Sequence, residues 1–254
     1  MIKKILKKIL PRPLLGRLRG FYYGLTNKFT YTEDGLYTII NTDFLETPSF
    51  IKSYQIGKSL MQDSWDNYDF RWRAYVLCWA AAQASRLEGD FVECGVNTGM
   101  HTRMIIDYIH FESLPKKYYL LDTFTGMSEK YSSPDEMNRS RAMGYTSDIF
   151  ESVQKSFIQF KNVELIKGPV PETLPRVPSQ KISFLSIDMN CVLPEVAALD
   201  FFWDRIVNGG IIILDDHGFP GHEEQRNAHY DFARRHNISI LPLPTGQGII
   251  IKNS

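Results

Sequence analysis

The stretch Gly89-Asp90-Phe91-Val92-Glu93-Cys94-Gly95-Val96-Asn97-Thr98-Gly99 (GDFVECGVNTG) decides the fold that we expect for this chain. A short apolar run ends in a carboxylate, two glycines follow, and the segment after them is amphipathic. This order predicts a strand, a tight turn and a helix. Glycines at such a turn let the backbone approach a ligand, and the helix after them begins with free N–H groups. The stretch therefore indicates a binding site of the nucleotide type.

The spacing of the glycines narrows the kind of ligand. Dinucleotide-binding folds use G-x-G-x-x-G to hold a pyrophosphate, whereas Gly95 and Gly99 are spaced G-x-x-x-G behind the carboxylate of Glu93. A carboxylate at that place repels a pyrophosphate and attracts an ammonium or sulfonium group, and S-adenosylmethionine carries both. Glycine-rich turns also occur in α/β domains of many functions, so the motif alone leaves a purely structural interpretation open.

The composition predicts a folded α/β protein with an unevenly charged chain. At 254 residues, of which 43% are hydrophobic, the chain is long enough for one α/β domain with an appendage. The formal net charge is zero, but eight basic residues precede the first acid, Glu33: Lys3, Lys4, Lys7, Lys8, Arg12, Arg17, Arg19 and Lys28. The remainder therefore holds 21 basic and 29 acidic residues, a net charge of −8. We do not expect a body of this charge to bind nucleic acid.

The cysteines and the absence of long apolar runs point to the cytoplasm. Cys78, Cys94 and Cys191 are scattered, odd in number and lack metal-ligand spacing, which suits a reducing compartment. The sequence has no run of 18 apolar residues, and its N-terminus lacks the apolar core and cleavage site of a signal peptide. We expect a cytoplasmic protein.

Residues 1–10 form a basic amphipathic pattern, in which Ile and Leu recur at helical spacing opposite four lysines, until Pro11 and Pro13 are expected to stop the helix. One interpretation is peripheral contact of residues 1–20 with an anionic membrane surface, which would place the protein at the inner membrane face. The other is an arm that frays or packs in an oligomer, and the short length of the helix favours it. Residues 21–66 are poorly periodic. We therefore assign residues 1–66 to an N-terminal helix and cap, and residues 67–254 to the main domain.

Strand and helix patterns alternate through the rest of the chain. Residues 70–87 indicate a helix that is apolar nearly all round, which predicts burial against the sheet or against a second subunit in a homodimer. The last two of the expected strands are joined by a loop that is too short for a crossover helix. These patterns predict a doubly wound, mostly parallel, seven-stranded sheet with one antiparallel strand near the C-terminus. The strands are expected at 91–93, 118–121, 163–166, 182–187, 211–214, 238–241 and 248–251, with helices near 98–110, 148–161, 193–206 and 222–236.

Acidic residues follow several of the predicted strands, at the sheet edge where α/β proteins bind ligands. Asp122, after the second strand, is placed to bind ribose hydroxyls, although a strand-end Asp caps the next helix equally often. Asp188, Asp215 and Asp216 follow neighbouring strands and would crowd three carboxylates together, which is costly unless a cation neutralises them. Hard oxygen ligands without His or Cys suit Mg²⁺. We favour this metal site over the alternative, in which one or two of the acids only cap helices.

Six ordered motifs resemble the macrocin-type sugar O-methyltransferases, a family of class I, Rossmann-like, S-adenosylmethionine-dependent enzymes. They are GDFVECGVNTG, LLDTFTGM, IKGPVPETLP, FLSIDMN, NGGIIILDDHG and PTGQGIII, and they span about residues 70 to 252. The resemblance implies that Glu93, Gly95 and Gly99 hold the methionine part of the cofactor and Asp122 its ribose. It also implies a cofactor site completed by Asn97, Thr98, Thr123, Phe124 and Gly168, and Mg²⁺ bound by Asp188, Asp215 and Asp216.

The same resemblance implies a mechanism. The metal would lower the pKa of a sugar hydroxyl, a carboxylate would take its proton, and the alkoxide would attack the sulfonium methyl in line. Asp188 is our candidate for both metal ligand and base. His217, beside the Asp pair, is the second candidate for the base, and a structural role for it carries equal weight.

The sequence departs from the family in two places. The family usually carries Asp-Gly-Asp and then a Tyr after the fourth strand, while residues 188–191 read DMNC, so that Asn190 replaces a carboxylate. The segment 126–147 is expected to be a mobile lid, and it holds no His to act as a base. Its Arg139 and Arg141 either meet a nucleotide-sugar phosphate or stay solvated, which is the commoner outcome.

Three functions remain in view. The first is a Mg²⁺-dependent O-methyltransferase that acts on a sugar hydroxyl of a nucleotide sugar, a glycosylated natural product or a surface glycan. The second is a catechol- or flavonoid-type O-methyltransferase, for which Phe124, Tyr131 and Phe219 could supply aromatic walls. The third is a non-catalytic binding protein on a methyltransferase scaffold, for which Asn190 is the main indication.

Overall fold

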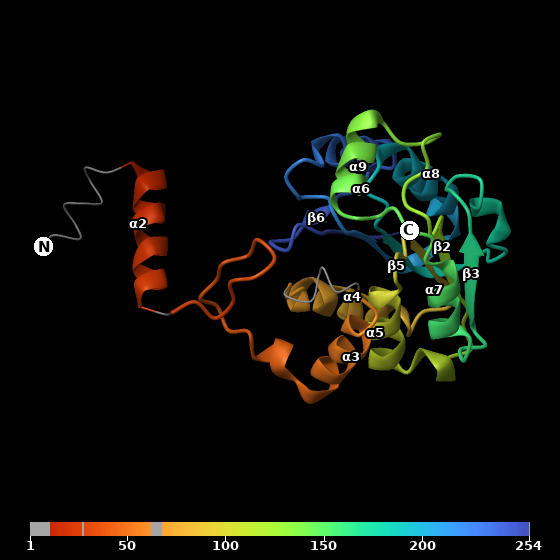
Figure 1. Ribbon diagram of the computed structural model, residues 1–254, viewed down its shortest axis with the longest axis horizontal. Coiled ribbons are helices and arrows are strands. Elements are labelled where there is room, and N and C mark those ends of the chain that lie inside the picture. The colour runs from red at the N-terminus through yellow and green to blue at the C-terminus, as the bar shows by residue number, and fades with distance from the viewer. Residues whose placement is uncertain (1–10, 27, 62–67, 254) are drawn as a thin grey trace, which may run out of the picture.

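The computed structural model describes residues 11–26, 28–61 and 68–253, so the helix expected at residues 1–10 lies outside the described residues. Seven strands form one sheet in the order β3-β2-β1-β4-β5-β7-β6. Figure 1 shows how the chain is arranged around this sheet. The strands are β1 (Asp90–Cys94), β2 (Tyr118–Asp122), β3 (Val163–Lys167), β4 (Ile182–Ile187), β5 (Ile206–Leu214), β6 (Leu241–Pro242) and β7 (Gly248–Ile251).

The strand directions confirm the predicted sheet. Strands β1 to β5 pair in parallel, and β7 is antiparallel to both of its neighbours, β5 and β6. The sequence order reverses between β1 and β4, and such a reversal opens a crevice at the carboxyl ends of the strands. The strand expected at 238–241 is shorter than predicted, because the N–H of Ile238 still bonds the helix carbonyl of Ala233 at 3.0 Å.

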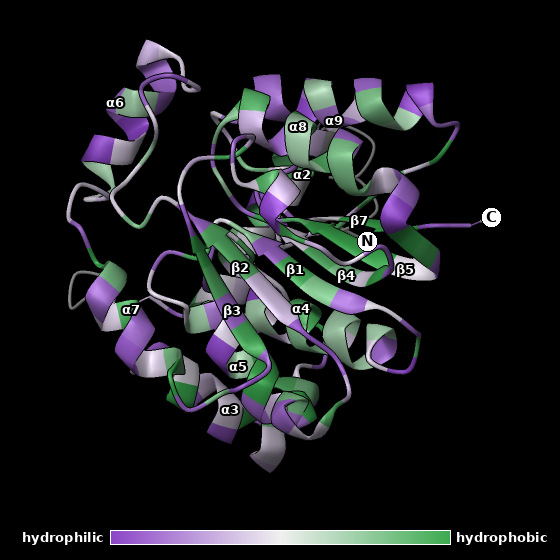
Figure 2. Ribbon diagram, turned by 90° about the vertical axis from the view of Figure 1, so that its right-hand side faces the viewer, coloured by the Kyte–Doolittle hydropathy of each residue, from purple (hydrophilic) through white to green (hydrophobic). Residues whose placement is uncertain are grey.

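Helices cover both faces of the sheet (Figure 2). One face carries α3 (Pro48–Lys58), α4 (Arg71–Ala84), α5 (Met100–Ile109) and α7 (Phe150–Phe157), and the other carries α8 (Val192–Phe202) and α9 (Glu223–Arg235). Neighbouring residues of a strand point to opposite faces, so Phe91 joins one apolar cluster and Val92 the other. Burial on both faces explains why β4, in the middle of the sheet, is buried at every residue and mostly apolar. Short 3₁₀ turns lie at Asp43–Glu46, Phe111–Ser113, Leu174–Arg176 and Trp203–Arg205.

The glycine turn has the predicted form, with β1 before it and α5 after it. Gly95 has a φ of +91°, and a Cβ on it would overlap the carbonyl oxygen of Asp188, so a side chain cannot stand there. Gly99, with a φ of +84°, is the N-cap of α5 and lies against the ring of Phe157. The turn therefore packs directly against the end of β4.

The N-terminal segment is more regular than its sequence pattern predicts. Helix α2 (Arg12–Leu25) projects away from the rest of the molecule (Figure 1). Pro11 is its N-cap and Pro13 lies in its first turn, so these prolines begin a helix, as the fixed φ of proline allows. After it, Tyr31 and Thr38 form a bridge, and α3 then packs against α5.

The segment 126–147, expected to be a lid, contains helix α6 (Pro134–Ala142). Ser133 and Glu136 form a capping box, in which each side chain bonds the backbone N–H of the other residue. The carboxylate of Glu136 also accepts the N–H of Val192 at 2.8 Å, which joins α6 to the start of α8. The part of the chain that the structure describes contains no helix long and apolar enough to cross a membrane.

Candidate active site

Two cavities open at the carboxyl ends of the strands. One, which we call the turn cavity, is lined by Gly95, Asn97, Asp122, Thr123, Phe124 and Gly168, among others. The other, which we call the acid cavity, has a volume of about 550 Å³ and is lined by Arg73, Thr98, His101, Asp188, Asp215, Asp216 and His222, among others. Gly95, Asn97, Tyr145, Asp188 and Asn190 line both. The two cavities therefore meet beside the end of β4.

Asp122, the last residue of β2, holds the glycine turn in shape. Its Oδ2 accepts the N–H groups of Val96 at 2.7 Å and Asn97 at 2.8 Å, and its Oδ1 accepts the N–H of Phe124 at 2.6 Å. Backbone N–H groups that bond a carboxylate stabilise its charged form. Asp122 thus shapes the turn cavity and also lines it.

Glu93 lies beneath the turn rather than in either cavity. Its Oε2 accepts the hydroxyl groups of Thr102 on α5 at 2.7 Å and Tyr118 on β2 at 2.8 Å. Burial raises the pKa of this carboxyl to about 7. The predicted contacts of Glu93 and Gly99 with a cofactor stay predictions, because neither residue lines a cavity.

The three carboxylates expected at the sheet edge do lie together. One oxygen atom of each of Asp188, Asp215 and Asp216 can be chosen so that all three lie within 4.8 Å of one another. Burial, with the charges of the other two acids, raises the pKa of Asp188 well above its usual range. Burial and Asp215 also raise the pKa of Asp216, to about 6. The crowding predicted from the strand order is present.

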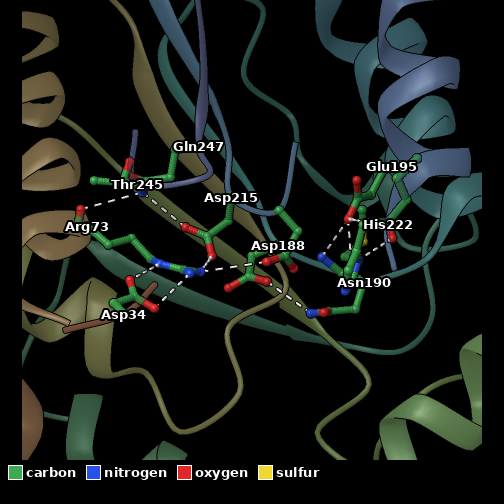
Figure 3. Close-up of polar contacts among 12 residues, drawn as sticks. Asp34, Arg73, Asp188, Asn190, Glu195, Asp215, His222, Thr245 and Gln247 are labelled. Carbon is green, nitrogen blue, oxygen red and sulfur yellow. Dashed lines mark hydrogen bonds and ion pairs between the residues drawn. The ribbon is translucent and has the colours of Figure 1, made fainter. Parts of the chain in front are cut away.

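Helix α4 brings a buried arginine into this cluster, which the sequence analysis missed (Figure 3). The Nη1 of Arg73 donates to Asp215 and lies 3.6 Å from Asp216. Its Nε and Nη2 donate to Asp34, at 3.0 and 3.2 Å. The other oxygen of Asp215 accepts from Gln247 at 3.0 Å. Burial acts to raise the pKa of Asp215, but the attraction of Arg73 holds it below its usual value.

Asn190 is bonded to the acid at the junction of the cavities. Its Nδ2 donates to Oδ1 of Asp188 at 3.0 Å. The backbone N–H groups of Met189 and Asn190 both donate to Oε1 of Glu195 at 3.0 Å. Glu195 is buried and accepts a further hydrogen bond from Gln225 at 3.0 Å. The loop after β4 is therefore fixed from two sides.

Most of the residues of this site lie in a stretch that matches one known family. The sequence profile of the macrocin O-methyltransferase (TylF) family matches residues 70–243, which include the glycine turn and all three clustered acids. The chain belongs to this family. Asp34 and the rest of the N-terminal segment precede the matched residues.

Three known proteins resemble this chain at low sequence identity. A curated relative from Streptomyces olivaceus, 8-demethyl-8-(2,3-dimethoxy-alpha-L-rhamnosyl)-tetracenomycin-C 4'-O-methyltransferase, is 24% identical over 171 residues. The match covers 64% of this chain and 64% of that relative's length. Among solved structures, the O-methyltransferase NovP matches with a TM-score of 0.61 and 16% identity, over 72% of this chain and 80% of NovP. CalS11, a TDP-rhamnose 3'-O-methyltransferase of calicheamicin biosynthesis, matches in its apo form with a TM-score of 0.54 and 17% identity, over 85% and 97%. The two structures share the fold.

The histidine that we named as a second candidate base faces away from both cavities. His217 is buried, its Nδ1 lies 3.3 Å from the Nδ1 of His229, and its ring meets Tyr230 edge-on. Burial lowers its pKa to about 4. Instead, His101 from the first turn of α5 and His222 from the start of α9 line the acid cavity. The two glycines before α5 marked the turn that His101 follows, so the sequence could have pointed to His101. No sequence pattern marked His222.

The donor atoms suit the two ligands that the family implies. In the turn cavity, Asp122 offers a carboxylate, Asn97 an amide and Phe124 an aromatic ring. Together these groups suit S-adenosylmethionine, which has charged groups, ribose hydroxyls and an adenine ring. In the acid cavity, Asp188, Asp215 and Asp216 offer the oxygen ligands that Mg²⁺ prefers. The guanidinium of Arg73 already neutralises part of this cluster, so a metal ion would share these carboxylates with it.

Proposed function

We propose that the protein is an S-adenosylmethionine-dependent O-methyltransferase that methylates a hydroxyl group of a sugar. The observation that carries the proposal is the meeting of two cavities at Asp188. One cavity has a glycine turn and the carboxylate of Asp122, which suit the methyl donor, and the other is lined by carboxylates that suit an alcohol. Membership of the macrocin O-methyltransferase family supports the reaction, and the activity named for the Streptomyces olivaceus relative supports a sugar as the acceptor.

Asp188 is placed to handle the proton of the reaction. Methyl transfer forms a C–O bond, breaks the C–S bond of the donor, and releases S-adenosylhomocysteine and the hydroxyl proton. Asp188 lies where donor and alcohol would meet, and burial beside two like charges makes its carboxylate a stronger base than a solvated one. Asn190 holds the Oδ1 of Asp188, which leaves the Oδ2 to accept the proton.

We propose further that Mg²⁺ takes part. Asp188, Asp215 and Asp216 would hold it, and a bound Mg²⁺ lowers the pKa of a hydroxyl group that coordinates it. Arg73 keeps Asp215 ionised and oriented, and Gln247 fixes the other oxygen of that residue. These contacts pre-form one side of the cluster.

A catechol- or flavonoid-type acceptor is the second candidate. Of the aromatic residues that the sequence suggested as walls, Phe219 lines the acid cavity, Phe124 lines the turn cavity and Tyr131 lines neither. The hydroxyl of Tyr131 instead donates to Glu172 on the surface, at 2.7 Å. Only one of the three aromatic residues is therefore placed to stack on a planar acceptor.

The test combines binding and turnover. Calorimetry should show S-adenosylmethionine and S-adenosylhomocysteine binding to the purified protein, and formation of S-adenosylhomocysteine should then be measured with a panel of sugars and catechols. Asp188→Ala should reduce turnover by about 10²-fold or more, as expected for loss of a proton acceptor. Asp200→Ala, at an exposed acid of α8, is the matched control. No heat with either donor ligand, or turnover of catechols alone, would overturn the proposal.

We also propose that the protein works at an anionic membrane, and the exposed surface of helix α2 supports this proposal. Leu14, Leu18, Phe21 and Leu25 of α2 recur at intervals of three and four residues and are 42% to 70% exposed, so they form one apolar stripe. The first 32 residues of the chain hold eight basic residues and no acid. An exposed apolar stripe on a basic arm fits the surface of an anionic bilayer.

A further inference from the structure

The acid cavity carries a strong excess of negative charge. The described residues that line it include five carboxylates, Glu33, Asp34, Asp188, Asp215 and Asp216. They include one guanidinium, that of Arg73, and no lysine. With every carboxylate ionised, the formal charge of this lining is −4, and one bound Mg²⁺ would leave −2. The raised pKa values of Asp188 and Asp216 reduce the negative charge of the metal-free cavity. This negative charge affects whether a neutral glycoside or a negatively charged nucleotide sugar can enter the cavity.

We propose that the acceptor is an uncharged glycoside and that the carboxylates of the acid cavity exclude nucleotide-diphosphate sugars. The inference rests on the proposed function and goes further, because it chooses between two kinds of acceptor: a glycoside and a nucleotide-diphosphate sugar. A nucleoside diphosphate carries about two negative charges, and like charges brought together with little water between them repel strongly. A glycoside carries hydroxyl groups only, for which carboxylates are good hydrogen-bond acceptors.

Arg73, the one guanidinium among the described residues of the cavity lining, is already engaged. Its Nη1 bonds Asp215 and lies 3.6 Å from Asp216, while its Nε and Nη2 bond Asp34. The guanidinium also lies over the ring of Phe219, 4.3 Å from the ring centre. To bind a diphosphate, this group would have to leave carboxylates that are themselves buried, and those charges would lose their partner.

Burial disfavours a charge on one histidine of the lining, and the other histidine is already hydrogen-bonded. Burial lowers the pKa of His101, which favours its neutral form. The Nδ1 of His222 lies 2.6 Å from Oε1 of Gln225, and Nε2 of Gln225 donates to Glu195 at 3.0 Å. Because an amide oxygen can only accept, Nδ1 of His222 donates this hydrogen bond and is already engaged.

The arginines of the lid segment are not placed to bind a phosphate. Arg139 and Arg141 line neither cavity. Arg141 lies on the surface, where its Nη2 is 3.8 Å from Glu129. Of the two interpretations that the sequence left for these residues, the structure supports a solvated Arg141 and gives neither residue a contact with the acid cavity.

The wall that completes the acid cavity comes from outside the family-matched residues. Thr32, Glu33, Asp34, Gly35 and Tyr37 all line it, and the matched residues begin at 70. The Asp34–Arg73 ion pair ties this wall to the acid cluster, and Tyr37 presents an aromatic ring at the cavity mouth. Aromatic rings and carboxylates together suit the apolar and hydroxyl-bearing faces of a sugar. The N-terminal segment therefore contributes two of the five carboxylates, Glu33 and Asp34, to this selectivity.

The test compares two acceptors that share one sugar. Protein saturated with S-adenosylhomocysteine is titrated with methyl α-L-rhamnoside and with thymidine-diphosphate rhamnose, by calorimetry or saturation-transfer NMR, with and without Mg²⁺. We expect the nucleotide sugar to bind at least tenfold more weakly, and the ratio to shrink as NaCl is raised from about 50 to 500 mM, because salt screens the repulsion.

Two variants locate the cause. Glu33→Gln removes one charge from the cavity lining and leaves Asp188, Asp215 and Asp216 in place, and should improve nucleotide-sugar binding severalfold relative to glycoside binding. Glu224→Gln, at an exposed acid of α9 outside both cavities, removes the same charge elsewhere and should change neither affinity. Nucleotide-sugar binding as tight as that of the glycoside, or no glycoside binding at about 10 mM, would overturn the inference. Failure to bind S-adenosylhomocysteine would instead overturn the proposed function itself.

Discussion

Asn190 donates its side-chain amide to Asp188, with 3.0 Å between Nδ2 and Oδ1, at the point where the two cavities meet. The macrocin-type pattern that residues 188–191 resemble has a carboxylate at this position, whereas this chain places a hydrogen-bond donor beside Asp188. The neutral amide removes one repulsion from a cluster that already holds three acids.

Asn190→Asp tests this relationship. The variant loses the donated hydrogen bond and places a fourth carboxylate beside Asp188, so we expect the metal-free protein to lose about 1–3 kcal/mol of stability at pH 8. Millimolar Mg²⁺ should restore part of the loss, since a cation would neutralise the added charge. Thermal melts in EDTA and in Mg²⁺ measure both effects. Equal melting temperatures for variant and parent in EDTA would contradict the account.

Asp122→Asn tests the support of the glycine turn. The carboxylate accepts three backbone N–H groups, and an amide would turn its NH₂ toward at least one of them. Loss of a charge-assisted hydrogen bond costs about 1.5–3 kcal/mol, so the affinity for S-adenosylhomocysteine should fall by about 10- to 100-fold in calorimetry. The control Asp200→Asn, on the surface of α8, should bind like the parent, and an unchanged affinity in Asp122→Asn would rule out this role.

Glu93→Gln tests a pH dependence of stability. The pKa of Glu93 is about 7 in the folded protein, above the usual value of 4.5, because burial disfavours its charge. Below pH 4.5 the carboxyl is protonated in both states and costs nothing. As the pH rises from 4.5 to 7 the unfolded state ionises first, and folding loses about 3 kcal/mol.

A glutamine can accept the hydroxyls of Thr102 and Tyr118 through its amide oxygen, and it does not titrate. The stability of Glu93→Gln relative to the parent should therefore increase by about 3 kcal/mol between pH 4.5 and 7.5, as measured by urea unfolding. A difference that stays constant across this range would show that the buried carboxyl does not titrate as described.

Phe21→Ser with Leu25→Ser tests the membrane proposal. Burial of a large apolar side chain contributes about 1.5–3 kcal/mol, so flotation with vesicles that contain phosphatidylglycerol should weaken by about tenfold or more. Ile158→Ser removes an equally exposed apolar side chain from the body, 79% exposed, and should have no effect. Equal flotation of the parent with anionic and neutral vesicles would contradict the membrane proposal. A change in the oligomeric state of the double variant would instead show that α2 packs in an oligomer.

The sheet and the acid cluster could be predicted because they follow from sequence patterns within single strands and helices. Apolar runs that alternate with amphipathic ones predict parallel strands, and the ends of parallel strands meet at one edge, so Asp188 and Asp215 had to be close. The capping box Ser133-x-x-Glu136 was equally readable, and it would have predicted the helix inside the lid segment.

The partners of the acids could not be predicted, because they come from far away in the chain. Arg73 lies 142 residues before Asp215, in a stretch that reads as a buried apolar helix, and Asp34 lies in a segment without periodicity. The sequence does not show whether the oxygen atoms of an Asp at a strand end face a ligand or bond the backbone. Asp122 bonds backbone N–H groups and also lines the turn cavity. His217 and His222 both lie in the β5–α9 connection, but His222 lines the acid cavity whereas His217 packs against His229.

The most direct test of the central claim follows the methyl group itself. The protein is incubated with S-adenosylmethionine carrying a ¹³C-methyl group and with methyl α-L-rhamnoside and other neutral glycosides, and the products are read by ¹³C NMR. The account predicts a new O-methyl signal on the sugar, formed with an equal amount of S-adenosylhomocysteine and absent with Asp188→Ala. Label that appears on no sugar hydroxyl, while the protein binds S-adenosylhomocysteine, would contradict it.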